Sequence, residues 1–150
     1  MRLISLVVLM LGFCFPVHAD DWFVSTTGGS TIELPGFLEA TRDLMENGIS
    51  HGTEYDPTDG SSFWVQQYWL NSDQTPHQFI AERYSDGAAT YEVDKPNFGV
   101  VSGYTVHNKP FYEICRRVTD RLECVEMGWL GADQDRVEPI ISRIVKSFRH

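Results

Sequence analysis

The clearest pattern of a central strand lies at residues 62–70, with the sequence SFWVQQYWL. Large apolar side chains occupy both sets of alternating positions in this segment. A strand that is buried on both faces of a sheet has this pattern, so a central strand is predicted here. One face would carry Phe63, Val65 and Trp69, and the other Trp64, Tyr68 and Leu70.

Further strands are predicted where apolar runs are bounded by turn sequences rich in Pro, Asn, Asp and Gly. The turns DKPN at 94–97 and HNKP at 107–110 separate strands in the second half of the chain. In the first half, the sequence DPTDG predicts a turn at 56–60. The predicted strands are residues 31–34, 51–55, 88–94, 98–106, 111–118 and 121–129.

Apolar residues at helical spacing predict a helix within residues 37–48, where Asn47 and Gly48 would end it. A second helix is predicted over residues 75–84. Thr75 can cap its N-terminus, Pro76 suits the first helical position and Gln78 can complete a capping box. The apolar residues of the first segment are Phe37, Leu38, Thr41, Leu44 and Met45, counting Thr41 as part of the face.

A third helix closes the chain, because its apolar residues recur at the 3.6-residue period. Pro139 is expected near the start of this helix, since a proline deep inside would cost about 3 kcal/mol. Together these elements predict an α+β fold, with a mostly antiparallel sheet and helices packed on its faces. The stripe consists of Val137, Ile140, Ile141, Ile144, Val145 and Phe148.

Two cysteines, Cys115 and Cys124, fall on the predicted strands 111–118 and 121–129. If these strands form a hairpin around Thr119 and Asp120, the numbers of every facing pair add up to 239, and the two cysteines are such a pair. Facing Cβ atoms lie about 4.5–5.5 Å apart, which permits a disulfide. The same register pairs Tyr112 with Met127, Ile114 with Val125, Arg116 with Glu123, and Glu113 with Glu126.

The face that carries Tyr112 and Ile114 is predicted to lie on the core. The face that carries Glu113, Glu126 and the cysteines is predicted to be the more exposed one. A structural disulfide is the favoured interpretation of the cysteines, because a zinc site needs more thiols or histidines at short spacing. Unpaired thiols and a redox role remain as alternatives.

The first nineteen residues are interpreted as a signal peptide cleaved after Ala19. Arg2 precedes a short apolar run that Pro16 ends, and small residues stand before the expected cleavage point. An uncleaved anchor is the alternative, although the run is shorter than the roughly 20 residues of a membrane helix. Residues 20–29 are expected to form a flexible tip, and residues 30–150 a single domain.

Charge changes the list of plausible partners. Residues 20–150 carry 11 Lys and Arg against 21 Asp and Glu, a net charge of −10. No cluster of basic residues interrupts this acidic composition, so nucleic acid and anionic membranes are not expected as partners. Export points instead to a periplasmic or secreted protein, which is an oxidising setting that favours a disulfide.

Candidate chemistry is sparse. The histidines do not form a compact ligand pattern, and the 56–60 segment lacks the spacing of a calcium loop. No cofactor or metal is predicted, and no catalytic residue is assigned. Glu113 and Glu126 could act as acid and base only if they lay in a cleft. The histidines after the signal are His51, His77, His107 and His150.

The aromatic residues could line a binding surface, but their strand alternation favours the core. Trp22 is the exception, because it lies in the expected tip and could be a docking segment or fold back onto the domain. The set consists of Trp22, Trp64, Tyr68, Trp69, Tyr104 and Trp129.

The second half of the chain resembles small exported bacterial proteins of unknown function, and through them the PsbP-like fold. The segments that carry the likeness are FGVVSGY at 98–104, PFYEICRR, CVEMGWL and PIISRIVKSF at 139–148. Glu138 stands where those proteins have an Asp. The resemblance implies an α/β/α sandwich around an antiparallel sheet and binding of protein partners rather than catalysis. It transfers no functional residue.

We therefore expect an exported, non-enzymatic accessory domain that presents a sheet edge or loop surface to a protein of the cell envelope. One alternative is a small hydrolase, which would show a pocket ringed by at least two of the candidate residues. Another is a small-ligand carrier, which would show an apolar cavity between sheet and helix. The oligomeric state is left open. The residues that would ring a hydrolase pocket are His51, His77, His107, Glu113 and Glu126.

Overall fold

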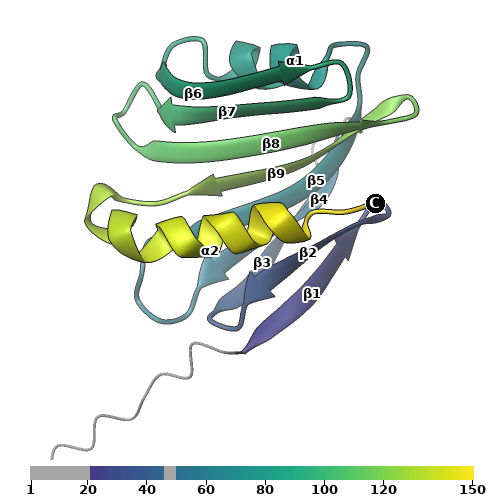
Figure 1. The fold of residues 1–150 in the computed structure, drawn as a ribbon. Helices are drawn as coiled ribbons and strands as arrows, with labels where there is room; N and C mark the ends of the chain where they lie inside the picture. The colour runs from purple at the N-terminus through teal and green to yellow at the C-terminus, as the bar shows by residue number, and fades with distance from the viewer. Residues whose placement is uncertain (1–20, 46–49) are drawn as a thin grey trace, which may run out of the picture.

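The computed structural model describes residues 21–45 and 50–150, which form a large sheet, a small hairpin and two helices (Figure 1). The large sheet is antiparallel and seven-stranded, in the order β3-β4-β5-β9-β8-β7-β6. Strands β1 and β2 pair only with each other as a separate two-stranded sheet. The strands are β1 (Trp22–Thr27), β2 (Ser30–Pro35), β3 (Leu38–Leu44), β4 (Ser50–Pro57), β5 (Trp64–Asn71), β6 (Ala88–Lys95), β7 (Phe98–Tyr104), β8 (Pro110–Val118) and β9 (Arg121–Gly128).

Each face of the large sheet has its own hydrophobic core. On one face, helix α2 (Gln134–Ser147) and the β1–β2 hairpin pack on residues such as Val65, Ile114 and Val125. On the other face, helix α1 (Pro76–Arg83) buries Ile80 against Leu122 and the disulfide. The sheet lies between two helical layers, as the predicted α+β sandwich requires.

The four strands predicted in the second half of the chain are confirmed as β6, β7, β8 and β9, and the helix predicted over residues 75–84 is confirmed as α1. Thr75 accepts a hydrogen bond from the Gln78 backbone, the Gln78 side chain accepts one from the Thr75 backbone, and Pro76 is the first helical residue. These reciprocal bonds satisfy N–H groups that a helix start leaves free. The capping sequence alone was therefore enough to place the beginning of α1.

Helix α2 follows the predicted apolar stripe, with Val137, Ile144 and Phe148 buried. Pro139 is not near the helix start, as the sequence suggested, but inside the helix. A 3₁₀ turn at Gly131–Asp133 precedes the helix, which starts earlier than the stripe does. Because Pro139 is exposed, its ring meets solvent rather than the sheet, at the cost of one helical hydrogen bond.

The helix predicted within residues 37–48 is wrong, because residues 38–44 form strand β3. Leu38 is buried opposite Pro57, while Arg42 lies opposite Glu54 and forms an ion pair with it. Pairing with β4 thus overrides the helical spacing of the apolar residues. Residues 46–49, where Asn47 and Gly48 were expected to end the helix, lie outside the described residues.

The expected loose tip is also replaced by a strand, because residues 22–27 pair along their full length with β2. Ser25 is buried and its hydroxyl donates to the Gln67 side chain at 2.5 Å. Trp22 folds back under Arg143, whose guanidinium lies 4.0 Å from the centre of the indole. The expected signal peptide lies outside the described residues. Within the described segments, neither helix is long and apolar enough to span a bilayer.

The hairpin of β8 and β9 has the predicted register, from Phe111 opposite Gly128 to Val118 opposite Arg121. Cys115 and Cys124 form a disulfide, with sulfurs 2.06 Å apart. The predicted exposure of this face is wrong. Both cysteines are fully buried, because α1 crosses the sheet above them.

Candidate functional site

A groove lies between α2 and strands β6, β7 and β8. In Figure 1, α2 crosses the sheet below these three strands and leaves their near face uncovered. The groove has a volume of about 420 Å³, which falls within the range of small-molecule pockets. Its lining residues are Tyr91, Ser102, Tyr112, Trp129, Gln134, Glu138, Ile141, Ser142, Val145 and Lys146.

The strand side of the groove is one row of facing residues. Tyr91 on β6 lies opposite Ser102 on β7, and Ser102 lies opposite Tyr112 on β8. Facing residues point to the same side of a sheet, so a small side chain stands between two large ones. The Ser102 hydroxyl donates a hydrogen bond to the Phe111 carbonyl at 3.0 Å, which keeps the serine side chain close to the backbone of the sheet. The row therefore has a hollow at its middle.

Tyr112 keeps its hydroxyl proton at neutral pH. Burial, together with the nearby Tyr91, raises the pKa of Tyr112 to about 12. Tyr91 reaches solvent, with 56% of its surface exposed. Each hydroxyl can therefore donate and accept hydrogen bonds at the edge of an aromatic surface.

The helix side of the groove combines apolar and charged groups. Ile141 and Val145 belong to the half-buried part of the α2 stripe. Glu138 and Lys146 are two turns apart on the same helix, so they place opposite charges along the groove. Trp129 also lines the groove, and its indole N–H donates a hydrogen bond to the Gln134 side chain at 2.9 Å. The lining suits an amphipathic occupant with an apolar body.

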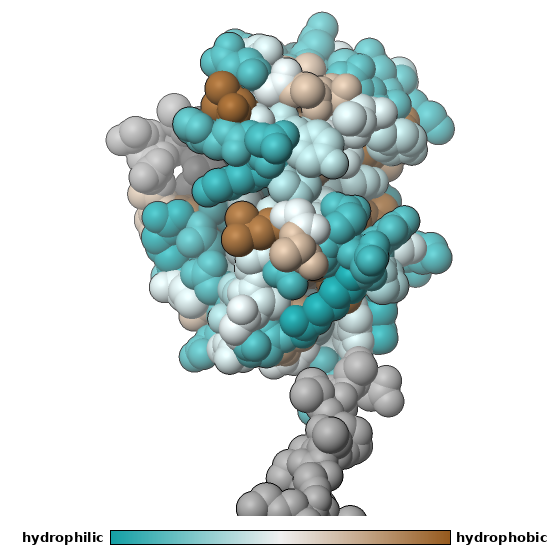
Figure 2. Space-filling model, turned by 90° about the vertical axis from the view of Figure 1, so that its left-hand side faces the viewer, coloured by the Kyte–Doolittle hydropathy of each residue, from teal (hydrophilic) through white to brown (hydrophobic). Residues whose placement is uncertain are grey.

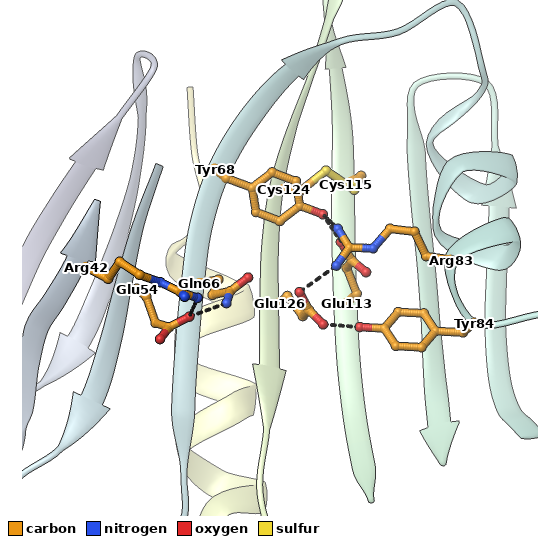
Figure 3. Close-up of polar contacts among 10 residues, drawn as sticks. All are labelled: Arg42, Glu54, Gln66, Tyr68, Arg83, Tyr84, Glu113, Cys115, Cys124 and Glu126. Carbon is orange, nitrogen blue, oxygen red and sulfur yellow. Dashed lines mark hydrogen bonds and ion pairs between the residues drawn. A yellow bond between two sulfur atoms is a disulfide. The ribbon is translucent and has the colours of Figure 1, made fainter. Parts of the chain in front are cut away.

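A second feature, on the opposite face, is a buried charge cluster (Figure 3). Glu113 and Glu126 face each other on β8 and β9, and Arg83 from the last turn of α1 reaches between them. The Arg83 guanidinium lies 2.9 Å from Glu126 and 3.5 Å from Glu113. Tyr68 donates to Glu113, and Tyr84 donates to Glu126.

Burial dominates the electrostatics of this cluster. Loss of water, together with the Glu126 charge, raises the pKa of Glu113 to about 7 against the opposing pull of Arg83. Burial and the two carboxylates also hold the pKa values of Tyr68 and Tyr84 well above their ordinary value. One Glu113 oxygen, Oε2, has no hydrogen-bond partner. The cluster thus contains a carboxyl group that titrates near neutrality.

A pKa near 7 is typical of a general acid or base, but such a group must touch its substrate. The Glu113 side chain has no exposed surface. Glu113 lies next to Cys115 and Cys124, yet the disulfide leaves no thiolate to bind a metal. The arrangement supports a structural role, in which Arg83 fastens α1 to the sheet.

A smaller hollow of about 250 Å³ opens at the end of the molecule that faces the viewer in Figure 2. The carboxylate of Glu126 reaches its wall, but both oxygens are already bound by Arg83 and Tyr84. Two exposed apolar side chains, Val106 and Leu130, lie in the loops at this end. Figure 2 shows such hydrophobic residues scattered on a mainly hydrophilic surface rather than joined in a patch.

The histidines are not brought together. His51 stacks on Trp69, with ring centres 4.6 Å apart, and His77 lies between Glu92 and Asp94. His150 contacts Glu123 at 3.2 Å and His107 is exposed in the turn after β7. Of the five candidate hydrolase residues, only Glu126 lines one of the two cavities described above. The condition set for a hydrolase is therefore not met at these cavities.

Some residues from the other features that the sequence analysis named lie outside the groove. Asp59, in the predicted 56–60 turn, forms an ion pair with Arg136. Trp64 packs over Gly128, where a Cβ would lie 2.4 Å from the indole ring. Tyr104 is 42% exposed. The sequence did not single out the groove residues Ser102, Tyr112 and Glu138 for function. Ser102 and Tyr112 lie in segments that carry the PsbP-like resemblance, and Glu138 directly precedes another.

Comparison with known proteins identifies the fold. No protein-family model and no curated protein sequence matches the chain. The chain is similar to the solution structure of cyanobacterial PsbP (CyanoP) from Synechocystis sp. PCC 6803, with a TM-score of 0.61 and 10% identity. The match covers 93% of this chain and 98% of that one. The protein therefore has a PsbP-like fold, as the sequence resemblance predicted.

Proposed function

We propose that this protein is an exported, non-enzymatic accessory domain that binds a segment of an envelope protein in the groove between α2 and strands β6–β8. The groove itself carries the proposal. Its volume of about 420 Å³, its aromatic row and its two opposite charges suit an amphipathic segment of protein. The fold supports it as well, since the resemblance to PsbP-like proteins implies protein binding.

Export is supported by two features that are independent of the groove. Residues 1–19 have the composition of a signal peptide. The Cys115–Cys124 disulfide suits an oxidising compartment such as the periplasm or the exterior. A location outside the cytoplasm would bring the domain to envelope partners.

Site-specific photocrosslinking in exporting cells tests this function. A photoreactive residue replaces Tyr91, at the open side of the groove, and a control replaces Glu39, which is exposed on β3 at the other edge of the sheet. We expect a discrete protein adduct at position 91 and none at position 39, because only the first lines the groove. Adducts of equal strength at both positions, or none at position 91, would contradict the proposal.

A small-ligand carrier is the second candidate, because the groove is a cavity between sheet and helix, as that alternative required. Native mass spectrometry of the purified protein separates the two. A carrier would show a bound small molecule that is lost when Ser102→Trp fills the hollow between Tyr91 and Tyr112. A protein-binding domain would show the mass of the chain alone.

A further inference from the structure

Strand β6 is an exposed edge of the seven-stranded sheet. It pairs with β7 on one side, and on its other side no strand of the described chain lies against it. Seven of its eight residues are exposed. An edge strand of this kind presents free backbone N–H and C=O groups that can pair with another chain.

The two sides of β6 differ in chemistry. Glu92 and Asp94 point to the α1 side, because Glu92 faces Val101 of the core under α1. Their side chains remain 49% and 64% exposed. His77 lies between them, 3.7 Å from Glu92 and 3.6 Å from Asp94. This side of the edge is therefore acidic and open to solvent.

Helix α1 holds this acidic side in place. Its first turn packs directly on β7, where a Cβ at Gly99 would lie 2.4 Å from the backbone nitrogen of His77. Gly99 faces Asp94 across the strands. The close approach sets His77 beside the two carboxylates without covering their outer surface.

The opposite side of β6 is aromatic. Tyr91 borders the groove, and Tyr104, which faces Ala88, is exposed on the same side. Residues alternate between the two faces of a strand, so a segment added beside β6 would do the same. Its side chains would meet carboxylates on one face and tyrosines on the other.

Resting on the proposed function, we propose that β6 accepts an extended segment of the partner protein as an eighth strand. The segment alternates Lys or Arg with aromatic or branched apolar residues. Its basic side chains lie beside Glu92 and Asp94, and its apolar side chains lie over Tyr91 toward the groove. Backbone hydrogen bonds supply affinity in this mode, and alternate side chains supply specificity.

Geometry limits the pairing to the second part of β6. The register between β6 and β7 shifts between Ala89 and Tyr91, which marks a β-bulge. Bulges interrupt regular pairing, so the regular edge runs from Tyr91 to Lys95. Both acidic residues and the exposed tyrosine of the groove lie within this stretch.

A second copy of this chain fits the edge poorly. Antiparallel pairing of β6 with itself would bring the carboxylates of Glu92 and Asp94 close to their own copies, and like charges in facing positions are unfavourable. Acidic residues on an edge thus discourage self-association while favouring a basic strand.

The test uses a synthetic peptide that alternates Lys with Val and Tyr, titrated against the purified protein by calorimetry. We expect saturable binding and slower amide hydrogen exchange in β6. The matched peptide with Glu in place of Lys should not bind. The variant Glu92→Gln/Asp94→Asn should weaken binding about fivefold, through the loss of two facing charge pairs. Its control, Glu39→Gln/Asp43→Asn on β3, should bind like the parent.

Two N-methylated forms of the peptide test strand addition itself. Each blocks the amides of one edge of the extended peptide. In antiparallel pairing, which the rest of the sheet uses, only one edge can face β6 while Lys faces the acidic side. We expect one form to lose binding at least tenfold and the other to keep it. Equal binding of both forms, loss with both, or no binding of the parent peptide overturns strand addition. A crosslink at position 91 would still support the proposed function.

Discussion

Glu113 lies in an environment that differs strongly from its ordinary solution state. It is fully buried beside a second carboxylate, and Arg83 is the cation that reaches both. A buried charge is costly unless it is paired and hydrogen-bonded. The raised pKa shows that pairing with Arg83 does not fully offset the loss of water around Glu113.

This environment predicts a stability that falls with pH. The ordinary pKa of the group is 4.5 and the folded value is about 7, so the folded protein binds more protons between these two values. The stabilising contribution is complete below pH 4.5 and is lost as pH rises through 7. Glu113→Gln removes the titration, so we expect it to be more stable than the parent at pH 8 by on the order of 2 kcal/mol.

Urea unfolding between pH 5 and pH 8 measures this effect. The control is Glu39→Gln, which changes an exposed carboxylate on β3 and should leave the pH slope in place. If Glu113→Gln keeps the slope of the parent, the buried carboxyl is not the titrating group.

At the scale of elements, the β8–β9 hairpin is the central unit of the sheet, since β5 and β7 pair with its two sides. Its disulfide joins facing residues at a sequence separation of 9. In the chain-entropy treatment, closing a loop of this length stabilises the fold by about 2.5–3 kcal/mol.

We expect Cys115→Ala/Cys124→Ala to lose about 3 kcal/mol of unfolding free energy, because it removes the cross-link and also some packing under α1. Denaturation in guanidinium measures the loss. Unfolding the parent with reductant present serves as the control, since reduction removes the cross-link and keeps both side chains. A double variant as stable as the oxidised parent would show that the cross-link adds nothing to this hairpin.

Elements also differ in how far local sequence controls them. The capping box of α1 and the apolar stripe of α2 act within a few residues. Helix α1 begins where its sequence predicted, and α2 contains the predicted stripe although it starts before it. Strand β3 has the apolar spacing of a helix, but its residues pair with β4 instead. Pairing partners decide such a segment, and spacing along the chain does not reveal them.

At the scale of the whole molecule, the β1–β2 hairpin is attached to the large sheet through a small buried polar network. Ser25 bonds to Gln67 and to Tyr55, each at 2.5 Å, and Gln67 donates to the Ser30 carbonyl at 3.0 Å. Gln67 has no exposed surface. Buried amides need their hydrogen-bond partners, so the network fixes where the hairpin docks.

Ser25→Ala is therefore expected to cost about 1–3 kcal/mol, because it leaves a buried oxygen of Gln67 without its donor. Thr26→Ala is the matched control on the same strand. Its side chain is exposed, so its effect should stay within about 0.5 kcal/mol. Thermal unfolding of both variants measures the difference. Equal stability of Ser25→Ala and the parent would show that this network does not stabilise the docking of the hairpin.

The candidate site, too, could be predicted only in part from the sequence. The segments that build the groove were recognisable from sequence, because Ser102, Tyr112 and the stripe of α2 lie in strands and a helix with clear periodicity. That they enclose a groove could not be foreseen, since it depends on where α2 crosses the sheet. The same folding keeps His51, His77 and His107 apart and joins Glu113 and Glu126 in the buried cluster on the other face of the sheet.

The sequence by itself determined the features that depend on spacing: the hairpin register that joins Cys115 to Cys124, the start of α1 and the buried stripe of α2. Tertiary structure alone decided which sheet face is covered, that residues 22–27 and 38–44 are strands, and that Glu113 is buried. The physical reason is that hairpin register and helix capping depend on residues close together in the chain. Burial depends on which distant elements pack over a residue.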